Sequence, residues 1–423
     1  MRSTFARFLL ASGLTNLGDG IALVAWSWLA TQLTRDPLLI ALVPVALKAP
    51  WFVFSLPAGI IVDRIDRRRA ILAADLLRAV AYGIAALAVW SALPFEAPPL
   101  RGTDRPGTFA LVALCAIIVG VAEVLRDNAA QTILPALIPE QDLERANGRL
   151  WTVEMVMNSF AGTALAGLLI GLSLALPFAV NAAAMAGAVM LVTRLHGDFH
   201  PETATQPRQT AGWRAELREG IAYLLKQPLL RGLAVLTGFF NFAFEAMMVT
   251  LVLIVQERLL LGPLALSAIM ASGAVGGIAA GLVNDRIVNR LGRGRVLQIA
   301  MISTFAVPLT VLLGGSGPGA LVLICAGFMV GEFWGILWNT VSVSHRQRSI
   351  PRRLLGRVNS AYRLFAIGMA PLGMLIAGLL TRGASDRFGR EVALTAPFWL
   401  ALAVFVALTL TYWRFLARAF LRS

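Results

Sequence analysis

Ionisable side chains in the middle of long apolar segments are the residues of this sequence that could do chemistry. Asp19 lies near the centre of the apolar segment 8–31, and Lys48 lies near the centre of 38–62. A charge at the centre of a bilayer costs about 2.5–3.5 kcal/mol on insertion scales, so such residues usually face a protein interior or a water-filled cavity. If the two residues meet, both can stay charged, whereas separating them makes neutral forms favourable. This pattern predicts a proton-binding site, with a permanent structural ion pair as the alternative.

Further polar residues repeat the pattern on other apolar segments. Glu245 follows Asn241 by one helical turn, much as Asp19 follows Asn16, and residues spaced in this way share a helix face. Glu332 and Glu154 also lie within apolar segments, at 317–340 and 149–172. The candidates for proton coupling and substrate binding are Asp19, Lys48, Glu245, Glu332, Glu154, Asn16 and Asn241.

The remaining chemistry-bearing residues predict no site. Asp75, Arg78 and Glu123 lie nearer the ends of their segments, where we expect them to reach water. Cys115 and Cys325 each lie alone in an apolar segment, without the spacing of a metal or redox site. We therefore expect no metal and no cofactor.

Aromatic residues in the same segments are candidates for the wall of a cavity. An aromatic cavity with few charges suits amphipathic organic molecules better than sugars or inorganic ions. The alternative is contact with lipid, because Trp and Phe are also common on lipid-facing surfaces and near interfaces. The candidates are Trp26, Trp51, Phe239, Phe240, Phe242, Trp334 and Trp338.

The elements that carry these residues are apolar segments long enough to cross a membrane. Of the 423 residues, 58% are hydrophobic and 14% are charged, whereas soluble domains are about 25% charged. A helix needs about 20 apolar residues to cross the hydrocarbon layer. We expect twelve such helices, and hence an all-α membrane protein, at 8–31, 38–62, 70–93, 108–126, 149–172, 174–195, 229–256, 262–284, 295–314, 317–340, 357–381 and 393–413.

The net charge of +14 reflects arginines that crowd one alternate set of loops. Examples are Arg64, Arg67 and Arg68 after the second segment and Arg286 after the eighth. By the positive-inside rule these loops are cytoplasmic, and so are both termini. The basic charge therefore reports topology, and we expect no nucleic-acid partner.

Two short sequences recur about half the chain length apart. "GIIVDRI" at 59–65 returns as "GLVNDRI" at 281–287, and "PEQDLERAN" at 139–147 matches "PRRLLGRVN" at 351–359. Each pair occupies equivalent places in two sets of six segments. Such internal repeats are typical of transporters whose substrate site lies between the repeats near the membrane midplane.

The repeat divides the chain into three expected parts. These are a six-helix bundle at 1–195, a cytoplasmic linker at 196–228 and a second, pseudo-symmetric six-helix bundle at 229–423. The linker contains "WRAELREGIAYLLKQ", which is typical of an amphipathic helix lying along the membrane surface.

The stretch "GIIVDRIDRR", 59–68, resembles the G-x-x-x-D-R-x-x-R-R/K loop signature of the major facilitator superfamily. The likeness covers essentially the whole chain. Asp66, together with "LPALIPEQDLERANG" and "LLGRVNSAYR", looks most like the branch that contains the enterobactin exporter and the macrolide efflux proteins. The resemblance implies the major facilitator fold and alternating access by rocking of two halves, commonly driven by proton antiport when the direction is export.

The resemblance also implies a cytoplasmic gate. In related transporters the aspartate that corresponds to Asp63 caps the start of the eleventh helix, which is expected near Gly356. The alternative is that the arginines only set the topology. The gate candidates are Gly59, Asp63, Arg64, Arg67, Arg68, Gly281, Asp285, Arg286, Arg357 and Arg363.

Two departures from the family pattern bear on export. Drug exporters often carry an arginine early in the fourth span, and none precedes Gly120 in "FALVALCAIIVGVAE". The antiporter motif of the fifth span usually contains Gly-Pro, and Thr163 stands in the proline position here. The glycines at 162, 167 and 171 still allow close helix contact.

These patterns predict a secondary active transporter of a bacterial inner membrane, acting as a monomer. We expect proton-coupled export of an amphipathic small molecule, such as a siderophore or a drug-like compound. The alternative within transport is an importer or facilitator. A membrane enzyme is disfavoured because the chain has no G-x-S-x-G, H-E-x-x-H or G-x-x-x-x-G-K-[ST] pattern.

Overall fold

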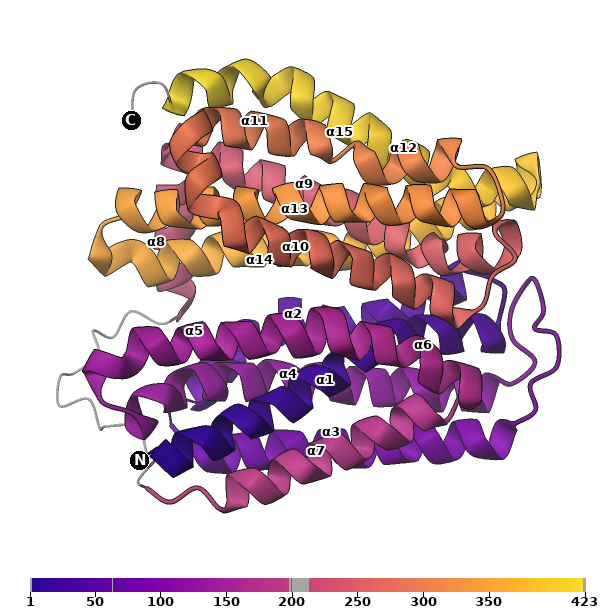
Figure 1. Ribbon diagram of the computed structural model, residues 1–423, viewed down its shortest axis with the longest axis horizontal. Coiled ribbons are helices and arrows are strands. Elements are labelled where there is room, and N and C mark those ends of the chain that lie inside the picture. Colours follow the sequence, from indigo (N-terminus) through magenta and orange to yellow (C-terminus); the bar gives the residue numbers. More distant parts are fainter. Residues whose placement is uncertain (1, 63, 198, 200–212, 421–423) are drawn as a thin grey trace. The chain divides into compact units, whose positions relative to one another are not determined.

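The computed structural model describes residues 2–62, 64–197, 199 and 213–420 (Figure 1). The regular structure of these residues is helical throughout, with no strand among them. Within the same residues, twelve helical runs are long and apolar enough to cross a membrane. The predicted all-α membrane fold with twelve transmembrane helices is therefore confirmed.

The chain forms two compact units, each with its own core. Unit 1 comprises Met1–Arg208 and Gly262–Ala271, and unit 2 comprises Gln209–Leu261 and Ser272–Ser423. The grouping of Gly262–Ala271 with unit 1 has no counterpart in the division expected from the sequence repeat.

Unit 1 is built from the helices drawn in indigo to magenta in Figure 1. They are α1 (Arg2–Leu33), α2 (Pro37–Val62), α3 (Arg67–Ala92), α4 (Pro106–Leu137), η1 (Glu140–Asp142), α5 (Leu143–Glu154), η2 (Met155–Gly162), α6 (Thr163–Leu172) and α7 (Leu176–Thr193). One buried cluster joins Phe8 of α1, Ile71 of α3, Ile133 of α4 and Val192 of α7. These apolar faces fix which sides of the four helices meet.

The fifth span contains a π-helical section, η2, which packs closely on α1. A Cβ atom added at Gly162 would lie 2.6 Å from the carbonyl oxygen of Leu17 and 2.8 Å from the Cα atom of Gly20. The hydroxyl group of the next residue, Thr163, donates a hydrogen bond to the Ser159 carbonyl oxygen at 2.8 Å. Only glycines at this crossing let the two backbones come so close.

Unit 2 contains the remaining helices. They are α8 (Trp213–Lys226), α9 (Pro228–Leu253), η3 (Ile254–Arg258), α10 (Pro263–Leu291), α11 (Arg293–Ser303), α12 (Ala306–Leu313), α13 (Pro318–Ser349), α14 (Arg352–Phe388) and α15 (Arg390–Phe420), with the first residues of α10 in unit 1. Helix α8 occupies the segment for which an amphipathic helix was expected.

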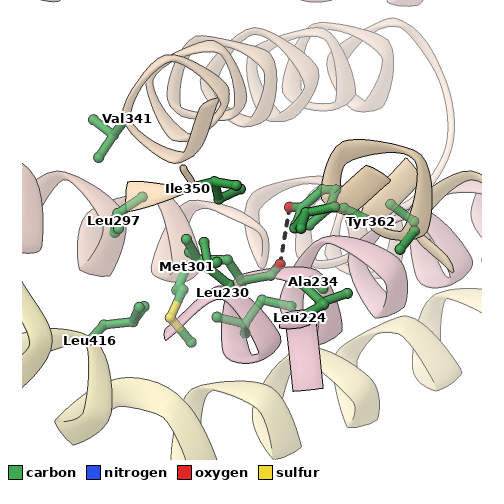
Figure 2. Close-up of a cluster of buried hydrophobic side chains, with 14 of the residues drawn as sticks. Leu224, Leu230, Ala234, Leu297, Met301, Val341, Ile350, Tyr362 and Leu416 are labelled. Atoms are coloured by element: carbon green, nitrogen blue, oxygen red, sulfur yellow. Dashed lines mark hydrogen bonds between the residues drawn. The ribbon is translucent and has the colours of Figure 1, made fainter. Parts of the chain in front are cut away.

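Aliphatic side chains from several helices form the core of unit 2 (Figure 2). Leu230 of α9, Leu297 and Met301 of α11 and Leu416 of α15 meet in this cluster. The hydroxyl group of Tyr362 on α14 donates to the carbonyl oxygen of Leu233 at 3.2 Å, within the same core. The cluster therefore holds α9, α11, α14 and α15 in fixed register.

Several helices are longer than their apolar segments. The fourth span was expected to end at 126, yet α4 continues to Leu137. The tenth was expected to end at 340, and α13 continues to Ser349, while α14 begins at Arg352 rather than near Gly356. A boundary drawn where charges begin fails because arginine does not interrupt a helix when its side chain finds a partner or reaches water.

Candidate functional site

Asp19 of α1 forms a buried ion pair within unit 1. Its carboxylate accepts a hydrogen bond from, and forms an ion pair with, the guanidinium group of Arg78 on α3. The side chain of Arg78 is completely buried and that of Asp19 is 18% exposed. The structure therefore shows Arg78 as an ion-pair partner of Asp19, a contact that the sequence did not predict.

A second carboxylate, Asp75, extends this contact into a cluster. Its Oδ1 lies 3.8 Å from Nη1 of Arg78, one turn along α3, and 3.5 Å from Nε of Arg126 on α4. Arg126 in turn lies 3.7 Å from Oδ1 of Asp127. Asp75 is fully buried and neither of its carboxylate oxygens has a hydrogen bond among the described residues. The nearby charges of Arg78 and Arg126 offset part of the cost of removing this carboxylate from water.

Helix α2 brings a third cation close to the same cluster. Gly120 of α4 lies against the carbonyl group of Leu47, so closely that a side chain at 120 would overlap the α2 backbone. This crossing places Lys48 beside the turn of α4 that carries Glu123. Glu123 interacts electrostatically with Lys48, Asp19 and Arg78. We call Asp19, Lys48, Asp75, Arg78, Glu123, Arg126 and Asp127 the charge cluster.

Sequence reasoning missed most of this cluster. Asp75 and Arg78 were expected to reach water, but both are fully buried, so that expectation was wrong. The fourth span was predicted to end at Arg126, but α4 continues for three more turns. The available signal was their spacing: Asp75 and Arg78 lie three apart, which places both on one face of an otherwise apolar helix.

Unit 2 holds a cavity of about 120 Å³ among α9, α11, α13 and α15. Four of the candidate residues line it, namely Phe240, Asn241, Glu332 and Trp338. A smaller space of about 20 Å³ adjoins it and shares Phe240 and Glu332 as lining residues. Residues that lie nearly a hundred positions apart in sequence thus meet around one polar and aromatic cavity.

The other three polar candidates are Asn16, Glu245 and Glu154. Asn16 donates its amide hydrogen to the Ser12 carbonyl oxygen of its own helix at 2.8 Å. Glu245 is half-buried on α9. Glu154 is exposed at the end of α5 and interacts electrostatically with Asp127, Asp19 and Arg126 of the charge cluster.

The aromatic candidates have different surroundings. Trp26 is buried between Tyr82, at a ring-centroid distance of 6.1 Å, and Phe178, at 4.8 Å, so its ring packs inside unit 1. The ring of Trp334 packs edge-on against that of Phe333 at 5.5 Å. The others are half-buried or exposed, namely Trp51, Phe239 and Phe242.

Asp63, the central gate candidate, lies outside the described residues. Next to it, Arg68 donates from Nε to the Val192 carbonyl oxygen at 3.0 Å and also bonds the Thr193 carbonyl oxygen. These are the last carbonyl groups of α7, where a cation is favourable. Asp66 accepts a hydrogen bond from the backbone N–H of Arg69 at 2.8 Å and so caps the start of α3.

The gate candidates of unit 2 lie on helices. Arg357 of α14 forms an ion pair with Glu219 of α8. Asp285 and Arg286 are exposed and lie within α10, whose helix continues to Leu291. Among the other arginine candidates, Arg64, Arg67 of α3 and Arg363 of α14 have no ion pair within the part of the chain that the structure describes. The two glycine candidates, Gly59 and Gly281, belong to α2 and α10.

No group of three or more His, Cys, Asp or Glu side chains is arranged to hold a metal ion in the described ranges. The charge cluster fits this finding, because its carboxylates are interleaved with arginines rather than gathered around one point. The chemistry that both arrangements support is binding of protons and of small molecules.

Comparison with protein families gives a match that covers most of the chain. Residues 8–371 match the model of the Major Facilitator Superfamily. The chain is 26% identical to the multidrug efflux pump Tap of Mycolicibacterium fortuitum, over 96% of each protein. It is 24% identical to macrolide efflux protein A of Streptococcus pyogenes, over 85% of this chain and 84% of that protein.

Solved structures with the same fold are also transporters. A mutant of the nucleoside transporter NupG aligns with a TM-score of 0.74 at 12% identity, over 97% of this chain and all of that one. An inward-facing bacterial homologue of the iron transporter ferroportin aligns with a TM-score of 0.71 at 16% identity, over 97% and 99% of the two chains. At these identities the likeness concerns the fold alone.

Proposed function

Because the chain belongs to the Major Facilitator Superfamily, we propose that this membrane transporter exports amphipathic, drug-like organic molecules by alternating access, in exchange for protons. Export is supported by the relatives named as multidrug and macrolide efflux proteins. The proposal includes a monomer in the bacterial inner membrane, with cytoplasmic termini. The orientation of the termini is supported by the arginine-rich loops.

The observation that carries proton coupling is the composition of the charge cluster. It contains four carboxylates, Asp19, Asp75, Glu123 and Asp127, and three cations. The carboxylates therefore outnumber the cations by one, and the side chain of Asp127 is 37% exposed whereas that of Asp75 is fully buried. An uncompensated charge removed from water costs several kcal/mol, and binding one proton removes that cost. We infer that the cluster cycles between a protonated and a deprotonated state.

The proton gradient can supply the required work. One proton that crosses about 100 mV releases about 2.3 kcal/mol, and each tenfold concentration ratio costs about 1.4 kcal/mol. A one-to-one exchange therefore supports roughly a 40-fold accumulation of a neutral substrate. Substrate binding and proton binding must exclude each other for this exchange to be tight.

The test is transport into inverted membrane vesicles with an imposed interior-acid pH gradient. Ethidium and erythromycin should accumulate, and nigericin, which exchanges protons for potassium ions, should abolish the accumulation. Asp19→Asn and Asp75→Asn should lose gradient-driven uptake. Glu391→Gln, which changes an exposed carboxylate, is the matched control and should keep it.

A second measurement follows the protons directly. Addition of substrate to the solubilised wild-type protein in weak buffer should release protons that a pH indicator detects, and Asp75→Asn should release fewer. Accumulation that is insensitive to the pH gradient would contradict proton coupling. Uptake of neither compound would contradict export of drug-like molecules.

A further inference from the structure

Helices α11 and α13 of unit 2 meet along an apolar seam at the end of the unit where arginines gather. Leu297 of α11 belongs to the same buried cluster as Val341 and Ile350 of α13 (Figure 2). The candidate membrane span of α11 begins at Arg293, and that of α13 ends at Ser349. The seam therefore joins the two helices close to the level at which both leave the hydrocarbon layer.

Basic side chains continue this seam beyond its apolar part. Arg293 precedes Leu297 by four residues, which places both on one face of α11. On α13, His345 and Arg348 follow Val341 by four and seven residues, so they share the face that this apolar residue buries. The charges of Arg293 and Arg348 both act on His345, so the three side chains lie near one another. We call Arg293, His345 and Arg348 the basic cluster.

Neither arginine of the basic cluster forms an ion pair with an acidic side chain among the described residues. Glu219 of α8 pairs with Arg357 instead, and Asp285 of α10 accepts a hydrogen bond from the side chain that precedes it at 3.0 Å. Arg293 is half-buried and Arg348 is exposed, so a ligand can reach both. Cations held together without a counter-ion repel one another, and an anion between them replaces this repulsion by attraction.

Arg346, which lies between these residues in the sequence, has a different role. Its guanidinium carbon lies 3.7 Å from the centroid of the Tyr362 ring on α14. A cation over a ring face is a favourable contact, more so where water is excluded. The contact fixes the rotation of α13 about its own axis, and with it the placement of His345 and Arg348 beside α11.

An exposed apolar strip leads along α11 from the same end of the helix. Arg295 is exposed in the first turn, and Ile302, seven residues later on the same face, is 53% exposed. Leu309 of α12 is 40% exposed. Apolar side chains on the outside of a spanning helix contact acyl chains. A ligand that combines an anionic group with acyl chains would use both the basic cluster and the strip, whereas a free anion would use only the first.

We propose that the basic cluster, together with Arg295, binds the phosphodiester headgroup of an anionic phospholipid, whose acyl chains lie along the exposed strip of α11 and α12. Basic residues between membrane helices at their cytoplasmic ends bind anionic headgroups in this way. The bound lipid bridges cations of α11 and α13 and so stabilises the packing of the two helices. The inference goes beyond the proposed export and takes from it only the orientation of the arginine-rich ends.

The test measures lipid binding to the full-length protein in detergent by native mass spectrometry. Dioleoylphosphatidylglycerol is an anion, and dioleoylphosphatidylcholine has the same acyl chains and no net charge. Wild type should bind the first phosphatidylglycerol molecule at least about fivefold more tightly than the first phosphatidylcholine, since each basic residue near an anionic headgroup contributes roughly this factor. Inorganic phosphate should compete poorly with phosphatidylglycerol, because it has no acyl chains.

Substitutions of arginine by glutamine separate the basic cluster from the overall charge. The double variant Arg293→Gln, Arg348→Gln should lose roughly 30-fold in affinity for phosphatidylglycerol and stay within about twofold of wild type for phosphatidylcholine. Arg218→Gln changes an exposed arginine of α8 in the same unit and should keep the wild-type preference. Phosphatidylglycerol should also raise the thermal midpoint of wild type more than phosphatidylcholine does, and this difference should disappear in the double variant.

The outcomes separate this proposal from the proposed export. Equal affinity of wild type for both lipids overturns the lipid site, and so does a preference that survives the double substitution or is lost equally in Arg218→Gln. Displacement of phosphatidylglycerol by inorganic phosphate at matched concentration would assign the cluster to a free anion, which also overturns the lipid site. Should the double variant not fold, Arg348→Gln alone is expected to lose roughly fivefold, and an unchanged affinity there contradicts the proposal. A preference that depends on these arginines stands whether or not the protein exports ethidium.

Discussion

Replacing Arg78 by methionine should destabilise the protein strongly. Arg78 is fully buried and is the cation that pairs with Asp19 and lies 3.8 Å from Asp75. At an effective dielectric constant of about 20, the contact with Asp75 alone corresponds to roughly 4 kcal/mol of attraction. Methionine fills a similar space and offers no charge. Asp75 keeps Arg126 at 3.5 Å, but Asp19 loses its ion pair.

The loss of folding stability in Arg78→Met can be estimated from other substitutions that remove one partner of a buried ion pair. Removal of one partner from a buried ion pair typically costs 3–5 kcal/mol, because the other charge stays buried. Whole proteins are stable by about 5–15 kcal/mol. We therefore expect Arg78→Met to lower the thermal midpoint by roughly 3–6 °C, measured by fluorescence-detected size-exclusion chromatography after heating.

A second substitution shows whether the unpaired carboxylate is the cause. Asp19→Asn added to Arg78→Met should recover part of the loss, since a neutral amide costs less to bury than a carboxylate. Arg149→Met, which changes an exposed arginine of unit 1, should leave the midpoint unchanged. The reasoning is refuted if Arg78→Met melts like wild type, or if the double variant is no more stable than the single one.

Three further changes test local contacts. Gly162→Val should reduce the yield of monodisperse protein, because its Cβ would meet the α1 backbone and overpacking costs about 1–3 kcal/mol; Gly171→Val, where nothing lies within 4 Å, should not. Arg390→Gln removes two 2.8 Å hydrogen bonds to Glu257. The loss should be about 1 kcal/mol for this partly exposed pair, with a small decrease in the thermal midpoint. An unchanged midpoint would mean that the pair contributes nothing to stability. Asp66→Ala should cost about 1 kcal/mol by removing the cap of α3, and Asp66→Asn, which can still accept the bond, should melt close to wild type.

Local patterns in the sequence were sufficient for the membrane class and the number of spans. An apolar run of about 20 residues has few alternatives to a membrane helix, because lipid offers no partners for backbone N–H and C=O groups. The loop signature at 59–68 could also be recognised from the sequence, because all its residues lie in one short segment. The placement of Asp19 and Glu332 at membrane depth also followed from their position within such runs.

The partners of these charges depended on packing between helices that are distant in sequence. The ion pair between Asp19 and Arg78 of α3 was not predicted, because it depends on the close crossing of α1 and η2 at Gly162 and on the shared core of α1, α3 and α4. A hydrophobic pattern records which face of a helix is buried and not which helix covers it.

The same limit applies to the cavity of unit 2. The sequence marked Asn241, Glu332 and Trp338 separately, as polar or aromatic residues on apolar helices. Whether they surround one space was decided by the register of α9, α11, α13 and α15, which the buried cluster around Leu230, Met301 and Leu416 sets. Composition and periodicity thus determined the membrane fold, whereas side-chain packing across the bundle alone determined which buried charges are paired and which one faces a cavity.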